Sequence, residues 1–541
     1  MEPPRRIFLP YSWKNIPIPS ANAYRKRLVV MVESVIKRMR WKAFFFLRGG
    51  GSEEQKESNE KYGLNSRKCP PVVDELKPFE DDVLKLIENL EFRRTNDHFQ
   101  ERLRTDIDNI KKSNNVFVPA DKTKNLYEMD KQRYEKLLHE NITKHYKHAP
   151  EGTYHVVNSE AQKIADSLKV ADRMDSLARK EVFLTLKDHK DEFLGKLPCR
   201  LINPAKSEIG IVSKQILDRI NATIKEHLGV QQWKNSSDVT AWFASIERKD
   251  QCVFTCFDIC DFYPSISEDL LGKALDFAGK LTDIPDQEKT IILHSRKSLL
   301  FDAENDWVKK NRAGLFDVTM GCYDGAEACE LLGSYALAML PTAKYAKNDI
   351  GLYRDDGLAI QRTTSGRAAE KMKQDLIKHF ATLGLKITIQ TNLRTVNFLD
   401  MTLDLLCGKH FPYRKPNDTP SYIHKSSNHP PPILRNIPAA ISRRITDTSS
   451  DEAAFQQAAP IYNSALRASG YSETITFLTE RKDSSSRPGI TRKNHRPRKV
   501  IWFNPPFSKN VKSPIGKQFL RLVSKHFPQD QNSTRFSTAS R

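Results

Sequence analysis

Ten residues, Leu352 to Gln361, constrain the fold more than any other stretch of the chain. Apolar and polar residues alternate in LYRDDGLAIQ on either side of Asp355-Asp356-Gly357. An Asp-Gly step between alternating runs is a strong signal for a β-hairpin, so the pattern predicts two adjacent carboxylates at a tight turn. Because like charges that close repel, one interpretation is that a divalent cation neutralises them. The other is a solvated turn that simply favours Asp and Gly.

A third carboxylate stands earlier in the chain, in CVFTCFDICDFYPSIS from Cys252 to Ser267. Val253 to Phe257 reads as an apolar strand that Asp258 closes, and a capping box from Ser265 to Glu268 opens the next helix. Asp258 is therefore expected at the carboxyl end of a strand that feeds a helix, where α/β folds place ligand groups.

Brought together, Asp258, Asp355 and Asp356 would form a hard, all-oxygen site. Such a site suits two Mg²⁺ ions about 4 Å apart, or Mn²⁺ in their place, which activate a 3′-hydroxyl and stabilise a leaving pyrophosphate. The residues therefore predict nucleotidyl transfer as the reaction.

The composition points to a polyanionic partner. Lys and Arg total 87 against 67 Asp and Glu, a formal net charge of +20, and such an excess favours nucleic acid before a membrane surface. Hydrophobic residues make up 39% of the chain, too many for a disordered protein, yet no run approaches the roughly 18 apolar residues that a membrane helix needs. Eight cysteines without a secretory signal predict a reducing, intracellular compartment. The basic clusters are typical of nuclear proteins and serve nucleic-acid binding equally well.

These residues resemble a known family. Asp258 with Tyr263 is similar to the first palm motif of reverse transcriptases, and Tyr353-Arg354-Asp355-Asp356 resembles their Tyr-x-Asp-Asp box. The pairing is more specific than either half. Within reverse transcriptases the chain resembles the Penelope-like retroelement group, over about residues 110 to 527. The segments that carry this likeness are Lys187 to Lys190, YRKPND (413–418), SNHPPPILRNIPAAISRR (427–444) and IWFNPPFSKNV (501–511).

The resemblance implies roles for several residues beyond the carboxylates. Lys187 and Arg200 would grip the incoming triphosphate, as a point charge and a bidentate fork. Gly321 would let the backbone approach the nascent base pair. Tyr263 would pack under the sugar and exclude a 2′-hydroxyl, which predicts selectivity for dNTPs. Lys386 is the candidate proton donor to pyrophosphate, with a solvated strand lysine as the alternative.

The same resemblance predicts an α+β, right-hand polymerase with fingers, palm and thumb, the palm being an antiparallel sheet backed by helices. The expected segments are a basic N-terminal helix and linker (1–71), a helical N-terminal region (72–180), fingers (181–252), palm (253–410), a thumb-like helical region (411–480), and a basic linker with a C-terminal segment (481–541). Members of this group often carry a Gly-Ile-Tyr/Tyr-Ile-Gly endonuclease after the polymerase. This sequence ends at Arg541 without one, which leaves autonomous DNA nicking in doubt.

Basic residues late in the chain are the predicted phosphate contacts. They are Arg414, Lys415, Lys425, Arg435, Arg443 and Arg444, together with the basic arm at 481–499. A generically soluble basic surface is the alternative.

The predicted function is RNA-directed DNA polymerisation by a retrotransposon enzyme, with an RNA template, a DNA primer and dNTPs as partners and no membrane. Two alternatives stay open: a catalytically inactive, nucleic-acid-binding relic and an RNA-dependent RNA polymerase. Tyr263 and the Tyr-Arg-Asp-Asp box disfavour the second of these. The cognate template and the oligomeric state are left open by the sequence.

Overall fold

The computed structural model is a mixed α+β fold in which strands and helices alternate along the chain. The structure describes residues 5–7, 14–47, 62, 64, 67–123, 125–174, 179–303, 305–310, 314–319, 321–341, 345–415, 418–479, 500–528 and 535–538. The basic arm at 481–499 lies outside these residues, so its role stays a prediction. Among the described residues no helix is both long enough and apolar enough to cross a membrane.

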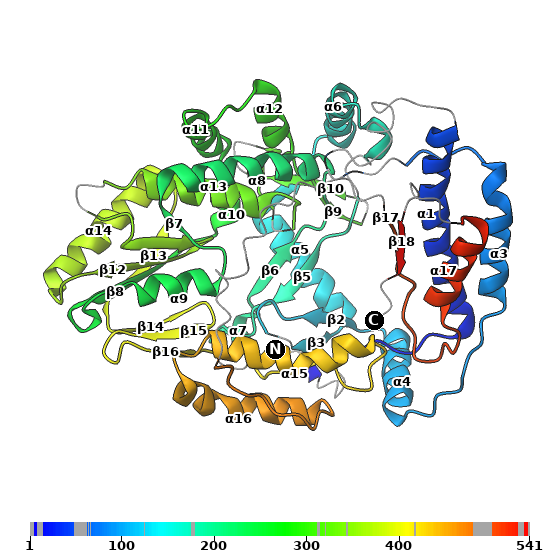
Figure 1. The fold of residues 1–541 in the computed structure, drawn as a ribbon. Coiled ribbons are helices and arrows are strands. Elements are labelled where there is room, and N and C mark those ends of the chain that lie inside the picture. Colours follow the sequence, from blue (N-terminus) through cyan, green and yellow to red (C-terminus); the bar gives the residue numbers. More distant parts are fainter. Residues whose placement is uncertain are drawn as a thin grey trace.

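A five-stranded sheet lies near the middle of the chain (Figure 1). Two of its strands contain Asp258 and Asp356, and Asp355 lies in the turn before the second of these strands. Its strands lie in the order β13, β8, β12, β11, β7, and each neighbouring pair is antiparallel except β11 with β7. The strands are β7 (Gln231–Gln232), β8 (Val253–Ile259), β11 (Ile350–Tyr353), β12 (Asp356–Gln361) and β13 (Ile387–Leu393). The predicted antiparallel sheet is therefore present, with one short parallel strand at its edge.

Helices cover one face of this sheet. Phe257 and Leu352 of the sheet share one core with apolar residues of these helices, such as Met372 and Leu376. Met372 and Leu376 lie one helical turn apart on α14 and are buried. The helices are α8 (Ile209–Leu228), α10 (Phe262–Ser265), α11 (Glu268–Gly279), α12 (Asp286–His294), α13 (Gly325–Ala338) and α14 (Gly366–Thr382).

The opposite face packs on α9 (Ser236–Ala244) and on a small antiparallel sheet. That sheet consists of β14 (Thr395–Phe398), β15 (Met401–Asp404) and β16 (His410–Pro412). Trp242, Phe254 and Phe398 lie in the core between these layers. Helices α15 (Pro431–Asp447) and α16 (Glu452–Ala468) follow and share a core of their own. They fall in the segment that the sequence predicts to be thumb-like.

Strands also occur in the region 72–180, where the sequence analysis expects helices. The helices there are α3 (Lys77–Glu88), α4 (His98–Lys112), α5 (Lys131–His145) and α6 (Thr153–Ser167), and the strands are β2 (Val116–Pro119), β3 (Leu126–Met129) and β4 (Tyr146–His148). The expected helices are present, and the short strands lie between them; two of these strands have partners far away in sequence. β3 pairs with β1 (Arg5–Ile7) and β4 pairs with β10 (Asn305–Lys309). Local periodicity does not report such pairings.

A second hairpin lies beside β2. It consists of β5 (Phe183–Leu186) and β6 (Cys199–Ile202), joined through the short helix α7 (Phe193–Lys196). Ala120, just after β2, forms a parallel bridge with Leu186 at the end of β5. A further sheet contains β4, β10 and β9 (Leu300–Asp302) in that order. The bridge between Ala120 and Leu186 places the turn between β2 and β3 next to the end of β5.

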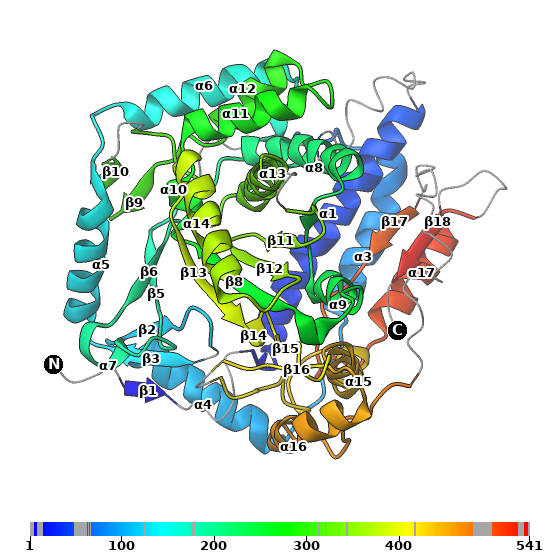
Figure 2. The same ribbon diagram turned by 90° about the vertical axis from the view of Figure 1, so that its left-hand side faces the viewer.

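The helix α1 near the start of the chain and the helix α17 near its end lie in one helical unit. α1 (Ala21–Leu47) and α3 pack with α17 (Ile515–His526), and Phe79 and Phe519 lie in their common core. Figure 2 shows these helices beside β17 (Val500–Phe503) and β18 (Arg535–Thr538). Lys525 Nζ and His526 Nε2 each lie 2.8 Å from Asp82 Oδ2, which ties α17 to α3.

The cap of α11 differs from the predicted capping box. Ser267 is the cap, and its side-chain oxygen accepts a hydrogen bond from Leu270 N at 3.1 Å. Ser265 instead ends α10, because the chain makes a separate helical turn after Asp261. The predicted helix itself is confirmed, beginning at Glu268.

Candidate active site

Asp258 and Asp356 lie directly opposite each other on β8 and β12. The N–H of Ile259 donates to the carbonyl oxygen of Asp355 at 2.9 Å. Residues 259 and 355 are therefore a hydrogen-bonded pair, and residues 258 and 356 are the non-hydrogen-bonded pair beside it. In such pairs the Cα atoms are about 4.5 Å apart and both side chains project from the same face. The sheet itself thus holds two carboxylates side by side.

The third carboxylate, Asp355, lies in the turn that joins β11 to β12. Tyr353 pairs with Asp356, so the turn residues are Arg354 and Asp355. Arg354 supplies the left-handed conformation, with φ of 56°. The predicted hairpin is confirmed, but Asp356 and Gly357 belong to the strand and not to the turn.

Gly357 serves packing instead. A Cβ at this position would lie 2.1 Å from Cζ of Phe257, its cross-strand partner. The Phe257 ring therefore covers the backbone next to Asp356, and glycine is the residue that leaves room for it.

The carboxylates perturb one another. Burial, followed by repulsion from Asp355 and Asp258, raises the pKa of Asp356 to about 6. Burial and then Asp355 also raise the pKa of Asp258. Burial, with a further effect of Asp356 and Asp258, raises the pKa of the neighbouring Cys256 thiol to about 11. A site in which anions raise each other's pKa favours a bound cation.

Three lysines act on these carboxylates from other parts of the chain. Lys122 and Lys190 lower the pKa of Asp258, while Lys122 and Lys415 lower that of Asp356, in each case against the larger effects above. Desolvation and then Lys122 lower the pKa of Lys415 itself. Lys415 is predicted from sequence as a phosphate contact of the thumb-like region, and the structure places it near the carboxylates.

Lys122 lies in the turn between β2 and β3, and Asp188 holds this turn in place. Asp188 is buried. One of its oxygens, Oδ2, accepts hydrogen bonds from Thr123 Oγ1 at 2.6 Å, Asn125 Nδ2 at 2.6 Å and Tyr127 Oη at 3.0 Å. A single buried carboxylate thus fixes the turn against the end of β5.

Lys187 and Arg200, the predicted triphosphate contacts, lie next to this turn. Arg200 Nη1 is 2.8 Å from Asp121 Oδ1. Burial, then Arg200, lowers the pKa of Lys187. Asp121 and Lys122 are not among the residues predicted from sequence, although the polar stretch DKTKN between the apolar runs VFVP and LYEM is a signal for a hairpin turn.

Tyr263 and Gly321, the other predicted nucleotide contacts, lie around the start of α13. A Cβ on Gly325 would be 3.4 Å from Tyr263 Cε1, so the ring packs against the first turn of the helix. Burial raises the pKa of Tyr263. Gly321 has φ of 113°, and a Cβ there would lie 3.4 Å from the carbonyl oxygen of Asn203. Glycine is therefore required by the backbone conformation at this position.

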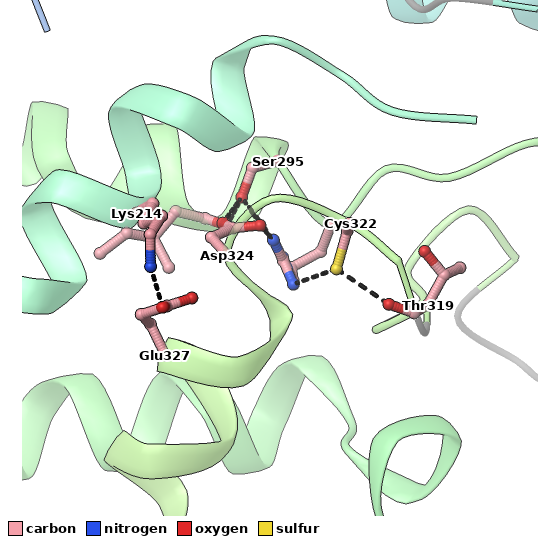
Figure 3. A network of polar contacts seen from close by, with 8 residues as sticks. Lys214, Ser295, Thr319, Cys322, Asp324 and Glu327 are labelled. Atoms are coloured by element: carbon pink, nitrogen blue, oxygen red, sulfur yellow. Dashed lines mark hydrogen bonds and ion pairs between the residues drawn. The ribbon is translucent and has the colours of Figure 1, made fainter. Parts of the chain in front are cut away.

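A buried polar network holds the loop that precedes α13 (Figure 3). Arg296 and Asp324 form a fully buried ion pair. Ser295 Oγ donates to Asp324 Oδ2 at 2.8 Å. Cys322 Sγ lies 3.6 Å from Arg296 Nη1 and donates to the carbonyl oxygen of Thr319 at 2.9 Å. These contacts link the loop to the residues that follow α12.

Lys386, the predicted proton donor, lies just before β13. Its carbonyl oxygen accepts a hydrogen bond from Cys260 N at 2.8 Å. Thr388, two residues later, is in register with Asp258. Because side chains alternate along a strand, Lys386 projects from the same face as Asp258. It is exposed.

The other predicted phosphate contacts have local partners or are open to solvent. Arg435 and Arg443 are exposed on α15. Arg414 Nη1 donates to the carbonyl oxygen of Asp418 at 2.7 Å. Lys425 Nζ lies 3.9 Å from Glu473 Oε2, and Arg444 Nη2 lies 3.3 Å from Asp400 Oδ2.

The donor set fits a divalent cation in its chemistry. Carboxylate oxygens are the ligands that Mg²⁺ and Mn²⁺ prefer, and Asp258 and Asp356 are cross-strand neighbours. In the described part of the chain no three Asp, Glu, His or Cys side chains come close enough to enclose a metal as they stand. The three carboxylates stay the predicted ligands, Asp258 and Asp356 as cross-strand neighbours and Asp355 in the adjoining turn.

Three comparisons relate this chain to known proteins. No protein-family model matches it, and no curated protein matches it. Among solved structures it is similar to telomerase from Candida albicans in complex with the TWJ fragment of telomeric RNA, at 10% identity and a TM-score of 0.47, covering 83% of this chain and 84% of that one. It is also similar to apo telomerase from Candida tropicalis, at 11% identity and a TM-score of 0.43, covering 79% of this chain and 80% of that one. A third similar structure is the RNA-dependent RNA polymerase of a human picobirnavirus, at 10% identity and a TM-score of 0.35, covering 73% of this chain and 87% of that one.

Proposed function

We propose that this chain is an RNA-directed DNA polymerase of a Penelope-like retrotransposon, which extends a primer 3′-hydroxyl with dNTPs. The observation that carries the proposal is the position of Asp258 opposite Asp356, with Asp355 in the next turn and Lys122 and Lys415 near them. Three carboxylates near lysine side chains suit a substrate that carries phosphates and binds together with metal ions.

Each group then has a part in the reaction. Asp258, Asp355 and Asp356 would hold the metal ions, which would supply the charge that activates the 3′-hydroxyl and stabilises pyrophosphate. Lys187 and Arg200 would bind the triphosphate, with Asp121 orienting the Arg200 guanidinium. Lys386 would donate a proton to the departing pyrophosphate.

We further propose that Tyr263 selects dNTPs over rNTPs. The Tyr263 ring is packed against the first turn of α13, which restrains it sterically. A restrained ring under the sugar would clash with a 2′-hydroxyl. Tyr263→Ala is therefore expected to raise ribonucleotide incorporation relative to wild type. An unchanged preference would remove this role.

The experiment is primer extension on an RNA template annealed to a DNA primer, with dNTPs and Mg²⁺. Wild type is compared with Asp355→Ala/Asp356→Ala and with Asp276→Ala, which removes a surface carboxylate 3.1 Å from Lys289. Extension by wild type and Asp276→Ala, but not by the double variant, is the expected result. Extension with rNTPs in preference to dNTPs would favour an RNA-dependent RNA polymerase. RNA binding without any extension would favour an inactive relic.

Metal binding has a readout besides activity. Mg²⁺ or Mn²⁺ should raise the melting temperature of the wild type, because a ligand that binds only the folded state stabilises it. The same ions should have little effect on Asp258→Asn/Asp356→Asn. An equal shift in both proteins would contradict the metal assignment.

A further inference from the structure

A cavity of about 770 Å³ lies between α6, the end of α12 and the segment 314–316. Ile164, Leu293 and Phe316 contribute apolar walls. None of the groups assigned to the proposed reaction lines it. Its volume and apolar walls are those of a small-molecule site.

Polar groups at this cavity have unused binding capacity. His294 lines it and is 7% exposed, and its Nδ1 has no hydrogen-bond partner among the described residues. Its Nε2 lies 3.3 Å from Glu160 Oε2, which also pairs with Lys297. A buried ring nitrogen without a partner is costly unless a ligand or water satisfies it.

Charge at the cavity favours an anion. Lys147 and Lys163 line it, are exposed, and form no ion pair with another described residue. Among the described residues that line the cavity, Lys297 is a third lysine, and the two carboxylates Glu160 and Glu268 leave a formal excess of one positive charge. An anionic group at the rim would therefore meet two unpaired ammonium groups, while its apolar part faces Leu293 and Phe316.

The cavity is continuous with the network that holds the loop before α13. His294 is followed directly by Ser295 and Arg296 of that network (Figure 3). On the other wall, the N–H of Asp317 donates to the carbonyl oxygen of Arg296 at 2.9 Å, and the N–H of Ser298 donates to that of Leu315 at 2.9 Å. Both walls therefore connect through the backbone to the segment that contains Cys322.

We propose that this cavity binds a small aromatic anion, a planar apolar body with one carboxylate or phosphate, and that binding alters the loop at Cys322. The proposal does not depend on the proposed polymerase function. The aromatic part fills the space between Ile164 and Phe316, and the anionic group meets Lys147 and Lys163. Displacement of either wall is passed to Arg296, whose guanidinium contacts Cys322.

The binding test uses defined probes on the full chain. 1-Naphthoate and 1-naphthyl phosphate are titrated by calorimetry, which distinguishes the carboxylate from the phosphate, with neutral 1-naphthalenemethanol as the uncharged control. One saturable site for at least one anion, at least about tenfold tighter than the neutral compound, is expected. Leu293→Trp and Ile164→Trp fill the cavity from opposite walls and should abolish binding, whereas Ile377→Trp, on the partly exposed surface of α14, should not. Binding that persists in both filled variants, or no saturable site, overturns the proposal.

Two further experiments test the role of the rim lysines and the effect of binding on the loop at Cys322. Lys147→Glu/Lys163→Glu changes exposed side chains and should weaken anion binding about tenfold, while Lys371→Glu on α14 should leave it unchanged. The rate of Cys322 alkylation by iodoacetamide, followed by peptide mass spectrometry, should change on addition of the bound anion, with exposed Cys407 as the internal reference. Equal changes at Cys322 and Cys407, or none at Cys322, would overturn the coupling.

Discussion

Asp258 on β8 and Asp356 on β12 occupy a non-hydrogen-bonded cross-strand pair, the arrangement that brings two side chains of an antiparallel sheet closest together. Two like charges in that position oppose folding, and Asp355 in the adjoining turn adds a third. The Phe257 ring over Gly357 leaves the backbone next to Asp356 little freedom to move away. The sheet therefore retains a destabilising charge cluster, which is typical of functional sites.

The cost of this cluster should depend on pH. The pKa of Asp356 rises from 3.8 to about 6 on folding, so the folded state binds more protons than the unfolded state between these values. Stability should therefore fall as pH rises through this window, by about 2–3 kcal/mol at most. Asp356→Asn removes the ionisable group and should unfold at a higher temperature than wild type at pH 7.5, with little difference at pH 4. Thermal unfolding in the presence of a chelator measures both.

Asp276→Asn is the control for this experiment, because Asp276 is an exposed carboxylate on α11. Its effect should be small at either pH. A gain from Asp356→Asn of the same size at pH 4 and pH 7.5 would show that the buried charge of Asp356 is not its source.

Two glycines should respond to alanine in opposite directions. At Gly357 a Cβ would overlap the Phe257 ring, and Gly357→Ala should cost about 1–3 kcal/mol or more. At Gly272, inside α11, a Cβ meets nothing within 4 Å, and Gly272→Ala should stabilise by about 0.5–1 kcal/mol. Calorimetric melting of the two variants checks both signs. Phe257→Leu should recover part of the loss at Gly357, and no recovery would mean that another contact causes it.

The central part of the site was predictable because its signals are local. Alternation around residues 355–357 indicates the hairpin, and an apolar run ended by Asp258 indicates the strand. The exact turn was not predictable from Asp356-Gly357, because the Phe257 ring across the sheet uses the glycine for packing. Arg354 takes the left-handed position that glycine usually fills.

The cationic side of the site was only partly predictable, because it depends on contacts between distant segments. The turn that contains Lys122 has a local signal, but its position relative to Asp258 depends on its contact with the distant strand β5. The buried Asp188 that fixes this hairpin is an ordinary surface residue as far as sequence shows. Arg296 and Asp324 were not predictable either, because charged residues are usually exposed. Their burial depends on the ion pair that they form in the folded chain.

Asp188 should control the order of the β2–β3 turn. Asp188→Ala removes the acceptor of three hydrogen bonds and should cost about 2–4 kcal/mol locally. Hydrogen exchange at residues 121–129 should become faster, while exchange in β8 stays slow. Asp191→Ala, an exposed carboxylate nearby, is the matched control and should leave exchange unchanged. Unaltered exchange in Asp188→Ala would mean that β2–β3 is held by its apolar contacts alone.

Arg296 and Asp324 form a buried ion pair beside the loop that precedes α13, and removing one charge should cost more than removing both. Asp324→Leu leaves the Arg296 guanidinium buried without its carboxylate, and the expected cost is about 3–5 kcal/mol. Arg296→Met/Asp324→Leu removes both charges and should recover most of that loss, because a buried pair gains little over apolar residues of similar size. Glu135→Ala, which breaks the exposed pair of Glu135 with Lys131, should cost less than about 0.5 kcal/mol. Thermal unfolding ranks the three variants, and Cys322 alkylation reports the loop directly. A double variant that is stable but labels Cys322 much faster than wild type would show that the pair positions the loop without stabilising the fold, whereas a double variant as unstable as Asp324→Leu would contradict the argument from burial.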